Sequence, residues 1–196
     1  MDDEPVVRKS IARLLRLSGF EAVSFESADD FLRGVVPEAE GCAILDIAMP
    51  GLDGLALQQA LIDRGIALPI LFLTGHGDVP GTVRAMKAGA SDFLTKPVED
   101  ATLIAAVHAA LERGRAAREA RQDHASIRAR LELLTPRERE VLEYVVAGRL
   151  NKQIGGELGI TEATVKVHRG RVMEKMRVTS LAELVHLADR IGLKSP

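Results

Sequence analysis

CAILD (residues 42–46) and PILFLT (residues 69–74) are two short apolar runs, and each of them ends in a polar residue. Runs of this length and composition are typical of parallel strands that are buried on both faces. Further strands are predicted at residues 21–25 and 92–94, and helical patterns occupy residues 5–18, 27–35, 55–64, 79–88 and the stretch that begins near Asp100. Short strands alternating with helices predict an α/β fold in which helices cover both faces of a doubly wound parallel sheet.

Polar residues follow the predicted strands at the points where they end. These residues are Asp46, Thr74 and Lys96, and the acidic pair Asp2 and Asp3 would join them if a strand preceded it. Ligands of such sheets bind at the carboxyl ends of the strands, so these side chains are the candidates for a functional site. For any one of them taken alone, an ordinary polar loop residue is the alternative.

Together, these residue types suit the transfer of a phosphoryl group to an aspartate. Carboxylates gathered at one edge repel one another unless a cation lies between them, and their hard oxygen atoms suit Mg²⁺. An aspartate beside Mg²⁺, with an ammonium and a hydroxyl group nearby, can attack a phosphoryl group in line and form an acyl phosphate. The pattern predicts Asp46 as the nucleophile, Lys96 as the counter-charge for the phosphoryl oxygens and Thr74 as a hydroxyl donor.

The second half of the chain contains only helical patterns. Residues 113–131 are rich in Ala and Arg and predict a helical linker with Gly114 as its weak point. Capping residues then predict helices at residues 136–147, 151–158, 161–176 and 180–191. The short turn at residues 159–161 gives the middle pair the spacing of a helix-turn-helix, in which the second helix enters the major groove. On that second helix Val165, Val172 and Met176 should face inward, and Lys166, Val167 and Gly170 should face outward. An ordinary amphipathic helix with solvated lysines is the alternative.

The charge is distributed unevenly along the 196 residues. Residues 1–112 carry 9 Lys and Arg against 17 Asp and Glu, a net charge of −8, whereas residues 113–196 carry 17 against 11, a net charge of +6. An acidic part joined to a basic part indicates two functions, the second of which involves a polyanion such as nucleic acid. A basic face that serves only solubility is the alternative.

Composition excludes several classes of protein. No apolar run approaches the roughly 20 residues of a membrane span, so no membrane partner is expected. The amino terminus, MDDEPVVRKS, is acidic where a secretory signal would be basic, which predicts a cytoplasmic protein. Cys42 is the only cysteine, which excludes an internal disulfide and a cysteine zinc cluster.

Four segments of the first half carry a family resemblance: DDEPVVRKS (2–10), LDIAMPGLDG (45–54), LFLTGHGDVP (71–80) and VRAMKAGASDFLTKP (83–97). They resemble the flavodoxin-like receiver domain of two-component response regulators of the FixJ type. The resemblance implies Asp46 as the phosphoacceptor and Mg²⁺ as the cofactor. Its implied ligands are Asp3, Asp46 and the backbone carbonyl of Ala48, with Asp2 as a second acid behind them. It also implies that Lys96 binds the phosphoryl group through a loop with a cis Lys96–Pro97 peptide, while Thr74 moves toward that group and Phe93 turns inward.

The sequence departs from this family at its beginning. Relatives carry an apolar strand of about five residues, a typical strand length, before the acidic pair, whereas only Met1 precedes Asp2 here. We therefore expect the first strand of the sheet to be missing from this chain, and the natural start to lie further upstream.

The segment LTPREREVLEYVVAGRLNKQIGGELGITEATVKVHRGRVMEKM (134–176) resembles the LuxR-type DNA-binding domain of FixJ and NarL regulators. This resemblance covers about residues 132–194 and implies an all-α domain of four helices. It implies that Lys166 and Val167 contact bases in the groove and that the last helix forms a dimer interface. The residues implied to lie near DNA phosphates are Lys152, Thr161, Thr164 and Arg169.

The two resemblances predict three regions: a receiver domain at 1–112, a helical linker at 113–131 and a DNA-binding domain at 132–196. The predicted function is that of a phosphorylation-controlled transcription regulator rather than an enzyme. Its expected partners are a sensor histidine kinase, double-stranded promoter DNA, RNA polymerase and, on activation, a second copy of the chain. One alternative is an aspartyl-phosphate phosphohydrolase, although such enzymes carry a second acid two residues after the nucleophile, where this chain has Ala48. The other is a regulator that acts only through protein contacts.

Overall fold

The computed structural model describes residues 1–36, 39–75 and 79–193. The chain divides into two compact units, Met1–Ala117 and Arg118–Pro196, and the dividing point lies inside the range predicted as a linker. None of the helices in the described ranges combines the length and the apolar character needed to cross a membrane.

The first unit contains a three-stranded parallel sheet within the part of the chain that the structure describes. Its elements are α1 (Pro5–Leu17), α2 (Ala28–Gly34), β1 (Ala43–Leu45), α3 (Gly54–Asp63), β2 (Ile70–Thr74), α4 (Val79–Lys87), β3 (Asp92–Thr95) and the start of α5 (Asp100–Glu132). The strand order is β1-β2-β3, so β2 is the central strand and is buried along its whole length.

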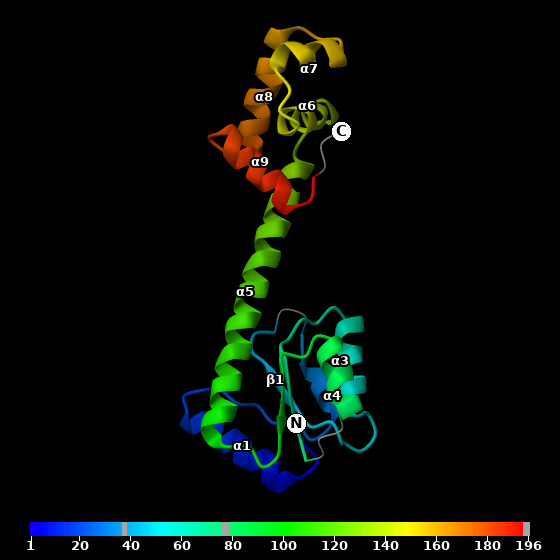
Figure 1. Ribbon diagram of the computed structural model, residues 1–196, viewed down its shortest axis with the longest axis vertical. Helices are drawn as coiled ribbons and strands as arrows, with labels where there is room; N and C mark the ends of the chain where they lie inside the picture. The colour runs from blue at the N-terminus through cyan, green and yellow to red at the C-terminus, as the bar shows by residue number, and fades with distance from the viewer. Residues whose placement is uncertain (37–38, 76–78, 194–196) are drawn as a thin grey trace. The chain divides into compact units, whose positions relative to one another are not determined.

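Alternate residues of β2 face two separate apolar cores. Ile70 and Phe72 pack in one core with side chains from α2, α3 and α4, and Leu71 packs in the other with side chains from α1 and α5. Figure 1 shows α3 and α4 on one side of the sheet and α1 and the first half of α5 on the other. The doubly wound α/β architecture predicted for this half of the chain is therefore confirmed.

The strand predicted at residues 21–25 is wrong, because these residues belong to no sheet. The edge of β1 that does not pair with β2 is bonded to Met1, whose amino group donates to the Ile44 carbonyl at 2.6 Å. The Met1 carbonyl in turn accepts from the Asp46 amide at 3.0 Å. Residues 20–25 and 39–45 line a common cavity of about 370 Å³, so a gap lies where the sheet could continue. A strand needs a hydrogen-bonded neighbour in a sheet, which the local sequence does not reveal.

The second unit is helical in its described residues. Beyond the end of α5 it contains α6 (Pro136–Val146), α7 (Asn151–Leu158), α8 (Glu162–Met176) and α9 (Leu181–Arg190). Thr135, Thr161 and Ser180 cap α6, α8 and α9, and Thr135 forms a full capping box with Glu138. Between α7 and α8, Gly159 adopts φ 65°, and a Cβ atom on Gly155 would lie 2.7 Å from the Ile160 carbonyl. The close turn of the helix-turn-helix therefore depends on these two glycines.

Candidate functional site

Asp46 follows β1 directly, and both its side chain and its backbone contact neighbouring residues. Its side chain accepts a hydrogen bond from the Ala48 amide at 3.2 Å, and the residue is only 5% exposed. Gly54, the first residue of α3, packs so closely that a Cβ atom there would lie 2.3 Å from the Asp46 carbonyl oxygen. Any larger residue at position 54 would displace the backbone that carries Asp46.

Lys96 reaches Asp46 from the far edge of the sheet. It follows β3, its amide donates to the Thr74 carbonyl at 2.7 Å, and the Lys96–Pro97 peptide is cis, as the family resemblance implied. Its Nζ atom lies 2.7 Å from Oδ2 of Asp46 and 2.6 Å from Oδ2 of Asp2. Burial alone would lower the pKa of this ammonium group, but hydrogen bonds to Asp2 and Asp46 and the attraction of both carboxylates raise that pKa above its ordinary value.

The acidic pair completes a cluster of three carboxylates. One oxygen each from Asp2, Asp3 and Asp46 lies within 4.8 Å of the other two. Asp2 is buried and already accepts from Lys96 and from the Glu4 amide at 3.0 Å, whereas Asp3 is exposed. A cluster of oxygen ligands with one exposed member fits Mg²⁺, which keeps several water ligands in most protein sites. Because both oxygens of Asp2 already accept hydrogen bonds, Asp2 fits the role of an acid that lies beside the metal ligands without binding the metal itself.

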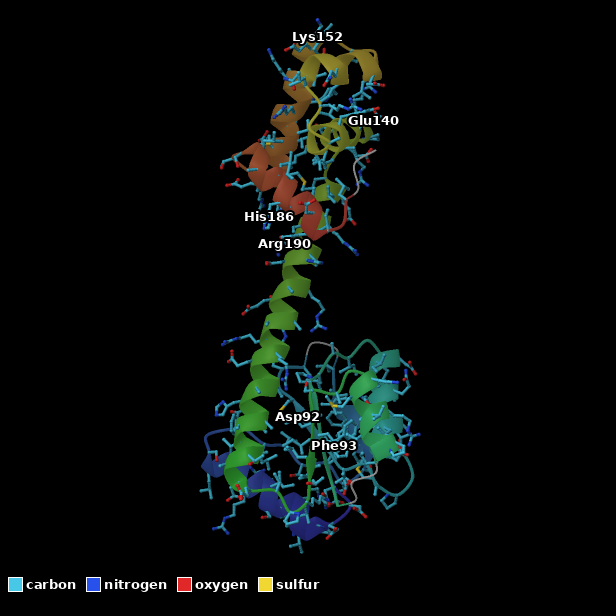
Figure 2. The ribbon with its side chains drawn as sticks, viewed as in Figure 1. Asp92, Phe93, Glu140, Lys152, His186 and Arg190 are labelled. Atoms are coloured by element: carbon cyan, nitrogen blue, oxygen red, sulfur yellow. The ribbon has the colours of Figure 1, made fainter. Side chains whose placement is uncertain are left out.

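The two residues predicted to switch lie on β2 and β3. Thr74 is the last residue of β2, is 2% exposed and lies opposite Thr95 in the parallel register. Phe93 lies opposite Phe72 and is half-buried against the first core. Figure 2 labels Phe93 and its neighbour Asp92 on β3. Thr74 therefore lies at the carboxyl end of the sheet, as Lys96 does. Phe93 lies two residues before the end of β3, the strand that Lys96 follows.

Two further residues shape the site, and the sequence interpretation did not identify either of them. Arg8 of α1 is largely buried, and its guanidinium donates to the Asp2 carbonyl at 2.7 Å and to Glu26 at 3.1 Å. This residue holds the acidic loop against α1. Gly54 is the second, through its contact with the Asp46 backbone. Its occurrence in the segment that follows Asp46 was the available signal.

The predicted DNA-binding residues lie on α7, α8 and the turn between them. Along α8 the inward and outward faces are as predicted: Val165, Val172 and Met176 are buried, and Lys166, Val167 and Gly170 are exposed. Val167 is 54% exposed, so its side chain is accessible on the outward face of α8. Lys166 forms an ion pair with Glu162 one turn earlier, at 3.3 Å.

The residues predicted near phosphates form two groups in the second unit. Thr161 caps α8, and its hydroxyl lies 2.9 Å from that of Thr164. Arg169 donates to the Asn151 side chain at 3.1 Å, and both line a cavity of about 440 Å³ together with Lys152. Figure 2 shows Lys152 near the start of α7, at the opposite end of the unit from Arg190 on α9. The N-terminal amides of α7 and α8 and the side chains of Lys152 and Arg169 are donors of the kind that suit phosphate oxygens.

Known proteins match the chain along nearly its whole length. Residues 1–108 match the response regulator receiver domain, and residues 132–188 match the luxR family of bacterial regulatory proteins. Nodulation protein W of Bradyrhizobium diazoefficiens is 46% identical over 195 residues, covering 100% of this chain and 86% of that protein. The transcriptional regulatory protein FixJ of Azorhizobium caulinodans is 47% identical over 195 residues, covering 98% and 92%. The structure of the response regulator StyR matches with a TM-score of 0.87 and 46% identity, covering 97% and 96%. The chain therefore belongs to the response regulators that join a receiver domain to a LuxR-type DNA-binding domain, and it is a phosphorylation-controlled transcription regulator.

Proposed function

We propose that Asp46 accepts a phosphoryl group from a sensor histidine kinase and that the phosphorylated protein binds promoter DNA as a dimer. One observation carries this proposal: the Lys96 ammonium bonds both Asp46 and Asp2 at the carboxyl end of the sheet, beside exposed Asp3. A nucleophilic carboxylate, an acidic metal-binding cluster and a fixed cation are the groups that phosphoryl transfer to aspartate requires.

The chemistry of the transfer uses residues of this chain at each step. A carboxylate oxygen of Asp46 attacks phosphorus in line; the P–O bond forms as the P–N bond to the kinase histidine breaks, and the imidazole nitrogen takes up a proton. We assign Asp3, Asp46 and the Ala48 carbonyl as ligands of Mg²⁺, which supplies positive charge to the phosphoryl oxygens when it is bound. Lys96 neutralises a further oxygen, and the Thr74 hydroxyl donates to another.

The switch follows from the charge that the reaction adds. The Asp46 carboxylate carries one negative charge before the reaction and the acyl phosphate carries about −1.5 to −2 after it, so the reaction adds roughly one negative charge at neutral pH. In our proposal Thr74 moves toward this group, Phe93 turns inward, and the receiver shifts toward a form that dimerises. Two copies of α8 then occupy half-sites one helical turn apart, with α9 at the dimer interface and RNA polymerase as the downstream partner.

The chain lacks a residue that a phosphohydrolase of this type would need. Position 48, two residues after the nucleophile, is an exposed alanine, so no acid there protonates a leaving group. This observation supports a regulator that is modified once per signal. Rapid multiple turnover on phosphate monoesters would contradict this assignment.

Phosphorylation is tested with the Asp46→Asn variant and a matched control, Asp53→Asn. Asp53 is an exposed aspartate that caps α3, and asparagine caps helices equally well. With a phosphorylated histidine kinase and Mg²⁺, the wild type and Asp53→Asn should become labelled, whereas Asp46→Asn should not. Label that persists in Asp46→Asn would place the phosphoacceptor elsewhere.

DNA binding is tested with duplexes selected from random sequence by the phosphorylated wild-type protein. The selected duplex should bind with an affinity that falls steeply with salt, because basic side chains release counterions from the phosphates. The Lys152→Met variant should weaken binding to all sequences alike, because this side chain is assigned to a phosphate. Failure to select any duplex would favour a regulator that acts through protein contacts.

A further inference from the structure

The last turns of α5 belong to the DNA-binding unit, although they precede the segment that matches the luxR family. The second unit begins at Arg118, whereas the family match begins at residue 132. Ile127 of α5 is 3% exposed and lies in the same core as Val172 and Met176 of α8. Residues 123–134, which we term the α5 brace, comprise the last turns of α5 and the two residues after it, and they contribute to the core on which the recognition helix rests.

Arg130 of the brace binds the end of the recognition helix. Its Nη1 atom donates to the carbonyl of Met176, the last residue of α8, at 3.2 Å. The last four carbonyls of a helix have no partner within the helix, and a cation there also interacts favourably with the helix dipole. The other guanidinium nitrogen donates to the Ser126 hydroxyl at 3.3 Å, which orients the group from within α5.

Lys175 makes the reciprocal connection from α8 to the end of the brace. Its Nζ atom donates to the Leu133 carbonyl at 3.0 Å and to Glu138 at 2.6 Å. Glu138 is 2% exposed and also accepts from the Thr135 amide at 2.9 Å, within the capping box of α6. Two cations, one from each element, therefore join the end of α8 to the α5 brace and to the start of α6.

The fixed end of α8 lies at a distance from the residues assigned to DNA. Lys166 and Met176 are ten residues apart on one helix, which corresponds to about 15 Å at 1.5 Å per residue. A tilt of about 10° at Met176 would move the Lys166 backbone by about 2–3 Å over that length. Base contacts require side chains to be held far more precisely than this.

From these contacts we infer that the α5 brace is a working part of the DNA-binding unit, with Arg130 and Lys175 as positioning residues that set the orientation of the recognition helix. The inference rests on the proposed function for its DNA readout. The residues that make the contacts at Met176 and Leu133 are not among those assigned to DNA. Arg130 and Lys175 therefore act through the placement of α8.

The test compares Arg130→Met with Arg128→Met in the full-length phosphorylated protein. Methionine keeps most of the aliphatic stem and removes the donor, and Arg128 is an exposed arginine on the same helix. Arg130→Met should bind a duplex selected by the wild type about 10-fold more weakly and a random duplex within about twofold of the wild type, that is, with a loss of specificity. Arg128→Met should keep the wild-type ratio, and Arg130→Lys should restore most of it. An equal loss in both methionine variants, or an unchanged ratio in Arg130→Met, would overturn the inference.

A second measurement needs no DNA and separates this inference from the proposed function. Amide hydrogen exchange at residues 172–177 of the free protein should be faster in Arg130→Met than in Arg128→Met. Exchange at the amides of α7 should be the same in both variants. If Arg130→Met does not fold, Ser126→Ala provides the comparison. Ser126 is exposed, and this substitution removes only the hydrogen bond that orients Arg130. Unchanged exchange at residues 172–177 would refute the role of the brace, whatever the DNA results. Failure of the wild type to select DNA would instead refute the proposed function.

Discussion

The Nζ atom of Lys96 lies 2.7 Å from Oδ2 of Asp46, although the two residues are 50 positions apart and follow strands that do not pair with each other. The central strand β2 separates β1 from β3, so this ion pair crosses the end of the sheet. The same ammonium group binds Asp2 at 2.6 Å. It therefore holds together two buried carboxylates that would otherwise repel each other.

Replacing Lys96 with methionine should destabilise the first unit. Removing one partner of a buried ion pair costs about 3–5 kcal/mol, and the partial exposure of Lys96 should reduce this to about 2 kcal/mol. Protection of the β2 amides against hydrogen exchange measures the change. Millimolar Mg²⁺ should restore part of the protection in this variant, since it also neutralises the carboxylates. Lys87→Met, at an exposed lysine of α4, is the control, and equal protection in both variants would contradict the role assigned to Lys96.

Replacing Asp3 with asparagine should weaken Mg²⁺ binding at least about 10-fold, or about 1.4 kcal/mol. Asp3 is the exposed member of the cluster, so this change removes one charged ligand without leaving a buried group unpaired. Isothermal titration with Mg²⁺ gives the affinity. Asp29→Asn, on the exposed first turn of α2, should bind as the wild type does. An unaltered affinity in Asp3→Asn would remove Asp3 from the ligand set.

Replacing each of two adjacent glycines of α7 with alanine should change the stability of the second unit in opposite directions. A Cβ atom on Gly155 would lie 2.7 Å from the Ile160 carbonyl, whereas one on Gly156 would meet nothing within 4 Å. Gly156→Ala should stabilise the second unit by about 0.5–1 kcal/mol, the usual helix preference for alanine. Gly155→Ala should destabilise it and weaken DNA binding, because the turn before α8 must open.

Urea unfolding followed by tyrosine fluorescence measures both changes. Tyr144 is the only tyrosine, the chain has no tryptophan, and Tyr144 packs against the second core. The signal therefore reports on that unit. Stabilisation by both alanines would show that the turn can relax around a side chain at position 155.

The second unit should lose stability in acid through Glu138. The hydrogen bond from the Lys175 side chain and that from the Thr135 amide lower the pKa of Glu138 below its ordinary value of 4.5. The folded unit therefore binds fewer protons than the unfolded chain as pH falls through this region, so stability rises with pH there. The contribution of Glu138 is complete above about pH 4.5 and is lost below it as the folded carboxylate becomes protonated.

The same tyrosine signal, recorded between acid and neutral pH, tests this dependence. Glu138→Gln should flatten the pH profile on the acid side, whereas Glu157→Gln, at an exposed glutamate of α7, should leave it as in the wild type. Identical profiles for the three proteins would show that other groups govern acid unfolding.

Features that depend on neighbouring residues in the sequence could be predicted well. The caps at Ser27, Thr135 and Thr161 are of this kind, because each side chain accepts from an amide three residues along the chain. The buried run at residues 70–74 and its polar end also suffice to place the central strand and one edge of the site.

Features that depend on tertiary neighbours could not be predicted in this way. Gly114 was expected to weaken its helix, yet α5 continues through it. The glycine is explained by a tertiary contact instead, because a Cβ atom there would lie 2.7 Å from Pro69. Arg8 and Gly54 were missed for a related reason: each meets a backbone carbonyl of an acidic residue, and no side-chain pattern records such a partner.

The link between Asp2 and Lys96 spans 94 positions of the sequence, which has a consequence for the newly made protein. Ribosomes add about 5–20 residues per second, so the acidic pair leaves the ribosome roughly 5–20 s before the lysine that neutralises it. Until that lysine arrives, the nascent chain has no assembled pocket to offer to a kinase. Under the proposed function, a chain can therefore receive the phosphoryl group only after its whole sheet has been synthesised.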